Sequence, residues 1–343
     1  MLKHHLAGYK RLLPILLVTL VASVARADEV GHFSPGVASI RDFTLPDPGF
    51  YGVAYNHFYW SSRLNDASGD TIRSVEVGQR RLQTTVDVDV NLKLYALAPV
   101  LLWASKFKIL GARIGAYVAP TFANSSVGAA LATASGRGGE ASASTFNVGD
   151  MYVQPAWLSW GLKHWDLGVS YGFYAPIGAY KTESIDLPIV GPLRVEASDN
   201  VGYGYWTHQL QGSTTWYPWE DQRMAVTGAV TYEFHGDKTD FDLKPGQDLS
   251  LTWGVSQFLP LVTDQTLLAE LGIAGYDSWQ TTVDHGSDAS DKARDQVHAV
   301  GGQMGLTYVP WMLVLNLHGF YEYLAKDRFQ GGSFGVNLAK KFL

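Results

Sequence analysis

Apolar and polar residues alternate along the stretch Val86-Asp87-Val88-Asp89-Val90-Asn91-Leu92-Lys93-Leu94-Tyr95-Ala96. Successive side chains of a β-strand point to opposite faces, so this stretch forms a strand with one apolar face and one face that carries ionisable groups. Residues 165–174 and 223–235 show the same period. The chain is therefore expected to consist of strands with one apolar face each, which either packs in a protein core or faces lipid.

The first 27 residues have the pattern of a secretory signal peptide. Lys3, Lys10 and Arg11 precede an apolar run over 12–24, and Ala25-Arg26-Ala27 places small residues where a signal peptidase reads them. The apolar run is shorter than the ~20 residues that a membrane-spanning helix needs, which favours cleavage over an uncleaved anchor. We expect a signal peptide over 1–27 and a single domain over 28–343.

Composition narrows the function classes. The 343 residues include no cysteine, which excludes disulfides and thiolate metal sites. Of the 26 Lys and Arg, four lie in the signal peptide, which leaves 22 against 32 Asp and Glu and makes nucleic acid an unexpected partner. Aromatic residues make up 13% of the chain. This content fits the aromatic girdles of a membrane barrel, although a large soluble β core would also contain many such residues.

Alternation and turn residues predict about twelve strands. They lie near 49–61, 83–98, 111–123, 148–161, 165–180, 202–217, 222–236, 248–258, 266–280, 296–308, 312–324 and 331–342. Short connections such as 162–164 alternate with long polar ones such as 181–201. Outer-membrane barrels have short periplasmic turns and long outer loops, and lipid tolerates no open sheet edge. The predicted fold is a single antiparallel transmembrane β-barrel with both termini on the periplasmic side.

Two connections are ambiguous. Residues 99–110 are too apolar for a bare turn, and either a short helix or a strand extension fits them. The Gly, Ala and Ser-rich stretch 125–144 has the composition of a flexible surface loop, or of a loop that folds inward as a constriction.

The stretch Leu45-Pro46-Asp47-Pro48-Gly49-Phe50-Tyr51 leads into the predicted first strand. It is similar to the opening of one known family, the outer-membrane transporters of the meta-pathway of phenol degradation. Gly149-Asp150 with Pro155 resembles its central G-D-x-x-x-x-P strand, and 176–180 resembles the P-x-G-x-Y that closes the next strand. The C-terminal strand ends with a penultimate Phe342, similar to the signal read by the outer-membrane assembly machinery. The resemblance implies a barrel that takes up aromatic or other hydrophobic compounds.

Polar residues that alternate with apolar ones are the candidates for the lumen, because a charge at the lipid midplane costs ~2–4 kcal/mol. They either set solute selectivity or form a paired network that fills a narrow barrel. The predicted lumen residues are Asp87, Asp89, Asn91, Lys93, Thr231, Glu233, His235 and Glu270.

Six aromatic residues are candidates for a stacking path for an aromatic solute. Interfacial girdles are the alternative interpretation, since Tyr and Trp favour the membrane interface. The residues concerned are Tyr55, Tyr59, Tyr174, Tyr203, Tyr205 and Trp206.

No motif indicates an enzyme, a cofactor or a metal site. There is no G-x-S-x-G, and His208, His235, His298 and His318 have no neighbouring serine arrangement. The expected partners are the outer-membrane lipid bilayer, the assembly machinery and small hydrophobic or aromatic solutes. The leading hypothesis is passive uptake through an outer-membrane channel, and the alternative is a non-transporting barrel that acts as an adhesin, scaffold or sensory partner.

Overall fold

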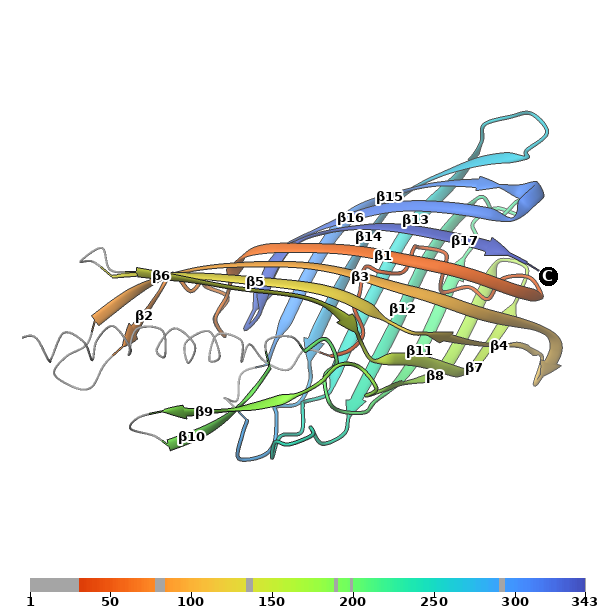
Figure 1. Cartoon of the computed structure of the whole chain (residues 1–343). Coiled ribbons are helices and arrows are strands. Elements are labelled where there is room, and N and C mark those ends of the chain that lie inside the picture. The colour runs from red at the N-terminus through yellow and green to blue at the C-terminus, as the bar shows by residue number, and fades with distance from the viewer. Residues whose placement is uncertain are drawn as a thin grey trace, which may run out of the picture.

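The structure, a computed structural model, describes residues 31–77, 84–133, 138–187, 191–197, 200–289 and 294–342. The predicted signal peptide lies outside these residues. In the described part of the chain, twelve antiparallel strands close into a barrel, because β1 pairs with both β17 and β3 (Figure 1). None of the helices in this part is long and apolar enough to cross a membrane.

The barrel strands follow the predicted order. They are β1 (Gly49–Leu64), β3 (Thr84–Ile109), β4 (Ala112–Ala119), β7 (Met151–Gly161), β8 (Trp165–Ala175), β11 (Thr207–Trp216), β12 (Met224–His235), β13 (Asp248–Pro260), β14 (Leu267–Gln280), β15 (Gln296–Tyr308), β16 (Leu313–Lys326) and β17 (Phe329–Lys341). The described chain also contains β2 (Ser74–Val77), β5 (Phe122–Thr133), β6 (Gly138–Val148), β9 (Thr182–Leu187), β10 (Gly191–Glu196) and the 3-10 helix η1 (Val309–Trp311). The prediction of a single antiparallel barrel is thus confirmed.

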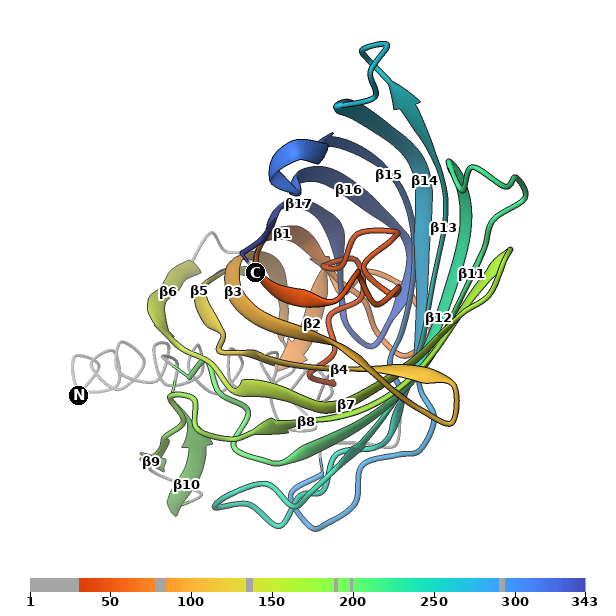
Figure 2. The same cartoon turned by 90° about the vertical axis from the view of Figure 1, so that its right-hand side faces the viewer.

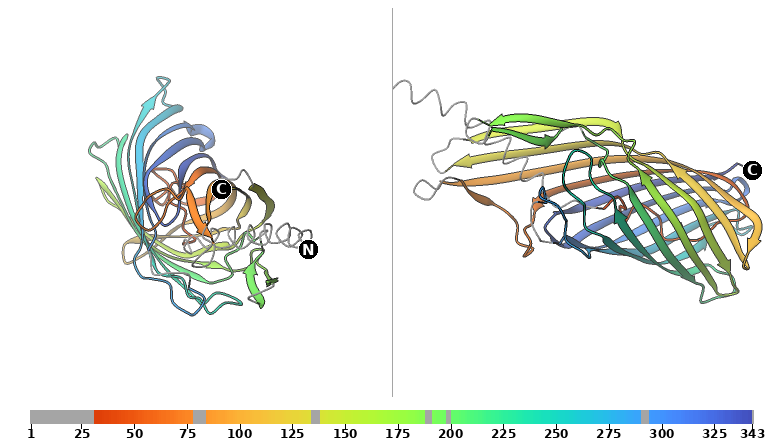
Figure 3. Two further views of the ribbon diagram at one scale, coloured as in Figure 1. Left: turned by 90° about the vertical axis from the view of Figure 1, so that its left-hand side faces the viewer. Right: turned by 90° about the horizontal axis from the view of Figure 1, so that it is seen from below.

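Part of the sheet projects beyond the barrel, where loops were predicted. Most of 125–144 forms the hairpin of β5 and β6 instead of a flexible or inward-folded loop. At the opposite end of β3, within the barrel, residues 99–109 continue the strand, which is the second of the two alternatives given for 99–110. β5 pairs with the outer half of β3, and β2 pairs with the start of β3. Figures 1 and 3 show these strands reaching far past the barrel mouth. The segment 181–201 likewise contains a hairpin, β9 with β10.

Two adjacent backbone breaks separate this projection from the barrel wall. Pro120 and Thr121 interrupt the line of β4 and β5, and Gly149 and Asp150 interrupt the line of β6 and β7. Proline has no N–H to give to a sheet, which explains the first break. Two hydrogen bonds connect the two interrupted segments. Gly149 N donates to Thr121 O, and the Thr121 hydroxyl donates to Asp150 O.

The outward face of β3 marks one edge of the lipid belt. From Tyr95 to Trp103 every second residue faces outward and is uncharged, and Leu101 is 56% exposed. Toward the outer end the same face carries Lys93, Asn91, Asp89 and Asp87, all exposed. Because lipid excludes charge, the apolar belt ends between Lys93 and Tyr95, and the outer part of β3 stands in water.

The segment before the first strand lies inside the barrel. Residues 31–48, here called the N-terminal segment, run through the lumen from the end where β12 and β13 meet their long loop to the end where β1 begins. Figure 2 looks along the barrel and shows this segment coiled within the ring of strands. The lumen is therefore partly filled by the chain itself.

Candidate functional site: the barrel lumen

A cavity of about 1380 Å³ runs through the lumen beside the N-terminal segment. One wall of it is apolar and comes from β1, β3 and β4. The inward residues of β3 form its longest part, which we call the apolar stripe: Leu92, Leu94, Ala96, Ala98, Val100 and Leu102. The cavity is larger than the ~300–1,000 Å³ of most ligand pockets, and many of its lining residues are polar or charged. Its apolar wall is the kind of surface that binds a small hydrophobic molecule.

The opposite wall is polar and holds the N-terminal segment. Arg41 Nε donates to Glu270 Oε1 at 2.8 Å, and the Ile40 amide donates to Gln303 Oε1 at 2.9 Å. Asn337 Nδ2 donates to the carbonyl of Val37. These partners come from β14, β15 and β17, so the segment supplies hydrogen-bond partners to some of the buried polar groups of one half of the barrel and leaves the apolar half facing the cavity.

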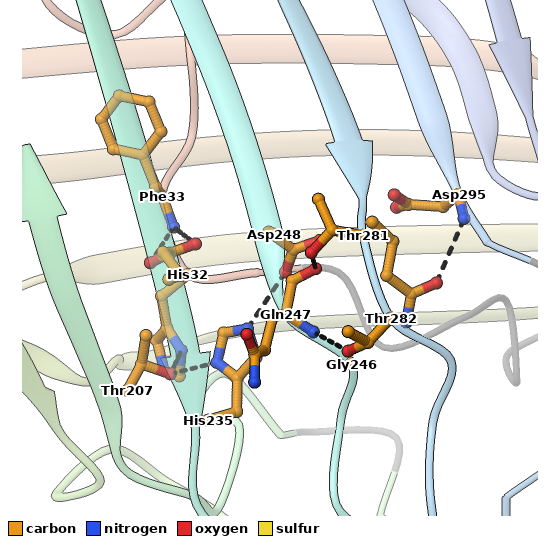
Figure 4. Close-up of polar contacts among 12 residues, drawn as sticks. His32, Phe33, Thr207, His235, Gly246, Gln247, Asp248, Thr281, Thr282 and Asp295 are labelled. Carbon is orange, nitrogen blue, oxygen red and sulfur yellow. Dashed lines mark hydrogen bonds and ion pairs between the residues drawn. The ribbon is translucent and has the colours of Figure 1, made fainter.

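The outer end of the N-terminal segment is held by a chain of polar groups (Figure 4). His32 Nε2 lies 2.9 Å from Asp150 Oδ2, and its Nδ1 lies 2.7 Å from the hydroxyl oxygen of Thr207. That oxygen is also 2.7 Å from His235 Nδ1, and His235 Nε2 is 3.0 Å from Asp248 Oδ2. The Phe33 amide donates to both carboxylate oxygens of Glu233.

The predicted lumen residues separate into two groups. Thr231, Glu233, His235 and Glu270 face inward and are buried, with Glu233 2% and Glu270 3% exposed. For Asp87, Asp89, Asn91 and Lys93 the predicted lumen orientation is wrong, because they are exposed on the outward face of β3. The prediction assumed that apolar faces point to lipid. Here the outer part of β3 stands above the apolar belt, so its charged face meets water and its apolar face turns inward.

This orientation leads to a testable expectation for Asp87 and Asp89. Replacing both with Asn should change neither the ion selectivity of the barrel nor its heat stability, because both carboxylates are in water. The check is planar-bilayer reversal potentials together with heat-modifiable gel migration of D87N/D89N against the unmodified protein. A shift of selectivity toward anions would place these residues on the path after all.

The aromatic candidates lie on both faces of the wall. Tyr55, Tyr59, Tyr174 and Tyr203 line the cavity, while Tyr205 is buried beside His32. Tyr55 donates to Asp42 Oδ2, and the Tyr174 ring stacks on His32 with 4.6 Å between centroids. Trp206 is 49% exposed and packs on Phe173, as a girdle residue does. Several of the tyrosines thus bind residues of the N-terminal segment by hydrogen bonds or ring contacts. The sequence did not suggest this role.

At the outer rim, a buried ion pair closes the turn between β16 and β17. Arg328 Nη1 donates to Asp295 Oδ2 at 3.1 Å. Burial raises the pKa of the Asp295 carboxyl to about 6, and the nearby Arg328 opposes this rise. The pair ties the loop before β15 to the end of the barrel.

Comparison with known proteins agrees with this architecture. The family model described as "Putative MetA-pathway of phenol degradation" matches residues 62–338. The chain belongs to this family. The resemblance seen in the short motifs is therefore confirmed, and the match covers the barrel strands from the end of β1 to β17.

Solved structures place this phenol-degradation family member among outer-membrane barrels. The COG4313 outer membrane channel from Pseudomonas putida F1 is similar with a TM-score of 0.61 and 13% identity, covering 91% of this chain and 100% of that one. The β domain of the Bordetella autotransporter BrkA has a TM-score of 0.45 at 12% identity, covering 86% and 100% of the two chains. The similarity to the Pseudomonas putida channel shows the fold, which is that of outer-membrane proteins of Gram-negative bacteria. No curated protein matches the sequence.

The structure also gives the central motif of this family member a physical role. Asp150, from Gly149-Asp150, is buried and accepts hydrogen bonds from the amides of Gly178 and Tyr203, both at 2.9 Å. Together with its contact to His32, this carboxylate joins the N-terminal segment to three parts of the wall. The role of His32 and Arg41 was missed because a partner more than 100 positions away is not visible in sequence. The one available signal was a span before the first strand that is neither highly charged nor of low complexity.

Proposed function

We propose that this protein is an outer-membrane channel for the passive uptake of small hydrophobic or aromatic compounds. The observation that carries the proposal is the apolar stripe, which runs along the cavity while the N-terminal segment covers the polar wall opposite. A hydrophilic solute would find no side-chain hydrogen-bond partner along the stripe itself, whereas an apolar solute that contacts it would gain about 25 cal/mol per Å² of apolar surface removed from water.

A gap in the wall offers such a solute a way in from the side. Among the described strands β6 pairs only with β5, and β8 ends at Ala175 well short of the projection. Phe146 and Val148, at the barrel end of β6, are exposed apolar residues. The cavity reaches this region, where it is lined by Phe122, Ala123 and Val201. A compound dissolved in the outer leaflet could therefore enter the cavity without crossing the polar outer loops.

Two further points of the proposal rest on sequence patterns. Residues 1–27 serve as a cleaved signal peptide that brings the chain to the periplasm, and the C-terminal strand with Phe342 is read by the assembly machinery. No catalytic role is proposed. The alternative of a non-transporting adhesin, scaffold or sensory barrel would use the long outer hairpins and would not need the cavity.

Filling the cavity tests the proposal. Ala98→Trp places a large ring on the apolar stripe and should reduce uptake of a labelled aromatic compound by a deletion strain that carries the variant. Leu101→Trp is the matched control, because Leu101 lies three positions along the same strand and faces lipid. Both variants should keep heat-modifiable migration. If the unmodified gene does not increase uptake of any phenol, aromatic acid or alkane, the non-transporting alternative holds.

A further inference from the structure

We propose that Glu233, His235 and Asp248 bind a divalent transition-metal ion of the zinc class at the outer end of the lumen. One ligand atom from each of the three residues lies within 4.8 Å of those from the other two, and all three residues are buried. The proposal concerns a site on the wall and does not depend on which compound the barrel transports.

The sheet register brings the three ligands together. Glu233 and His235 are two positions apart on β12 and share its inward face, and Asp248 of β13 lies directly across from Glu233. Two buried carboxylates are thus cross-strand neighbours. Among the described residues, neither forms an ion pair with a Lys or Arg side chain; the ring of His235 and the Phe33 amide are their partners. Adjacent buried carboxylates repel each other, and a cation between them removes that cost.

The hydrogen-bond chain that leads away from His235 is an independent observation in favour of a metal ion. The Thr207 hydroxyl oxygen lies between two ring nitrogens, Nδ1 of His32 and Nδ1 of His235. Each histidine also faces a carboxylate with its Nε2, His32 toward Asp150 and His235 toward Asp248. If both neutral rings carry their hydrogen on Nε2, both Nδ1 atoms are acceptors, and Thr207 has only one hydrogen for the two.

A metal ion on His235 Nε2 resolves this conflict without an additional proton. His235 then carries its hydrogen on Nδ1 and donates it to Thr207, the Thr207 hydroxyl donates to His32 Nδ1, and His32 Nε2 donates to Asp150. Every donor has an acceptor. Metal-bound histidines in proteins usually donate their second ring N–H in this way, which fixes the orientation of the ring.

The N-terminal segment begins beside the two carboxylates. Gly31 lies against Oε2 of Glu233 and Oδ2 of Asp248, and a methyl group at position 31 would overlap both oxygens. The absence of a side chain at this position therefore keeps a bulky group off the two ligand oxygens. The bound ion would therefore sit where the segment begins, next to the Phe33 amide that donates to Glu233.

The donor set selects the class of metal. One imidazole nitrogen with two carboxylate oxygens suits Zn²⁺ and similar transition ions, whereas Ca²⁺ and Mg²⁺ prefer oxygen ligands alone. We therefore expect Zn²⁺ to bind in the presence of excess Mg²⁺ or Ca²⁺.

The test is calorimetric titration of the full mature protein in detergent, without a histidine tag and after treatment with a chelator, using ZnCl₂. The unmodified protein should bind one equivalent of Zn²⁺, and Asp248→Asn should weaken that binding at least tenfold. Asp277→Asn is the matched control, because Asp277 forms a second Asp–His pair with His298 at 2.6 Å, to which the structure gives no third ligand among the described residues. This control should bind Zn²⁺ like the unmodified protein.

Two further measurements test whether Zn²⁺ binds to the folded protein at these ligands. Zn²⁺ should raise the temperature of unfolding of the unmodified protein and leave that of D248N unchanged, and both proteins should show heat-modifiable migration. Thr207→Val, which removes the hydroxyl that accepts from His235, should weaken Zn²⁺ binding while both carboxylates remain. The absence of an equivalent of Zn²⁺ on the unmodified protein would overturn the proposal, as would binding that D248N leaves unchanged. Such results would not affect the uptake measurements with Ala98→Trp.

Discussion

Asp150→Ala is expected to lower the free energy of unfolding by about 3–9 kcal/mol, because two part-buried amides and one histidine lose their acceptor at about 1–3 kcal/mol each. The Asp150 carboxylate is the common acceptor for the amides of Gly178 and Tyr203 and the partner of His32. Because it is buried, water does not replace it. Urea unfolding followed by tryptophan fluorescence measures the change.

Two comparison variants make this experiment specific. Asp150→Asn keeps one acceptor oxygen and should lose less stability than Asp150→Ala. Asp166→Asn removes a half-buried carboxylate whose hydrogen bond comes from the Tyr217 hydroxyl, and it should cost about 1 kcal/mol. Equal stability of the Asp150→Ala and Asp166→Asn variants would mean that Asp150 is not the joint between the N-terminal segment and the wall.

Asp150→Ala should also affect transport through the gap in the wall. Gly178 and Tyr203 both lie in the connection between the end of β8 and the start of β11. This connection borders the gap on the barrel side, next to the edge of β6 that does not pair with β5. The amides of both residues are held by Asp150, so this border of the gap depends on the Asp150 side chain. If hydrophobic compounds enter sideways, Asp150→Ala should change uptake more than it changes the conductance of small ions.

The barrel itself was predictable because apolar and polar side chains alternate along each of its strands. The face of a strand that meets lipid carries no charge, so the alternation shows which residues share that face. Leu249, Leu251 and Trp253 alternate with Ser250 and Thr252 on β13, and the structure keeps that alternation. Inward placement of Glu233 and Glu270 followed from the same rule. The number and order of strands therefore needed only local information.

The rule failed where its physical premise failed. Along β3 the outward face is charged at Asp89 and uncharged at Tyr95 and Leu97, because one end of the strand stands in water and the other in lipid. Alternation reports which residues share a face, but it does not report the height of a strand relative to the membrane. The projection of β5 and β6 was missed for a related reason, since its small residues have the composition of a loop and form a strand because β3 offers them a partner.

The position of the N-terminal segment depended on contacts that no local pattern encodes. Ile40, Arg41 and Phe33 bind residues that follow them by 200 positions or more. The N-terminal segment and the polar wall are each other's hydrogen-bond partners. The position of one therefore cannot be predicted without the other. The mixed site of Glu233, His235 and Asp248 was missed in the same way, because its ligands meet only through the register of β12 with β13.

Arg41→Met is expected to release the middle of the N-terminal segment and to raise the single-channel conductance of the barrel. The guanidinium of Arg41 donates to Glu270 at 2.8 Å and to the carbonyl of Arg223 at 2.6 Å, and it lies 4.0 Å above the ring of Phe258. Methionine keeps contact with that ring but leaves Glu270 buried without its cation, which costs about 3–5 kcal/mol. Planar-bilayer recordings measure the conductance, and urea unfolding measures the stability.

The double variant Arg41→Met with Glu270→Gln separates the two effects. Removing the uncompensated charge should recover part of the lost stability, since the amide at position 270 would be neutral and Gln303 remains beside it. The conductance should stay high, because the segment still lacks its attachment to the wall. Arg223→Met is the matched control, as its side chain pairs with Asp221 at the rim and should alter neither quantity strongly. A conductance of the Arg41→Met channel equal to that of the unmodified channel would show that the segment stays in the lumen without this ion pair, held by its contacts at Asp150 and Glu233.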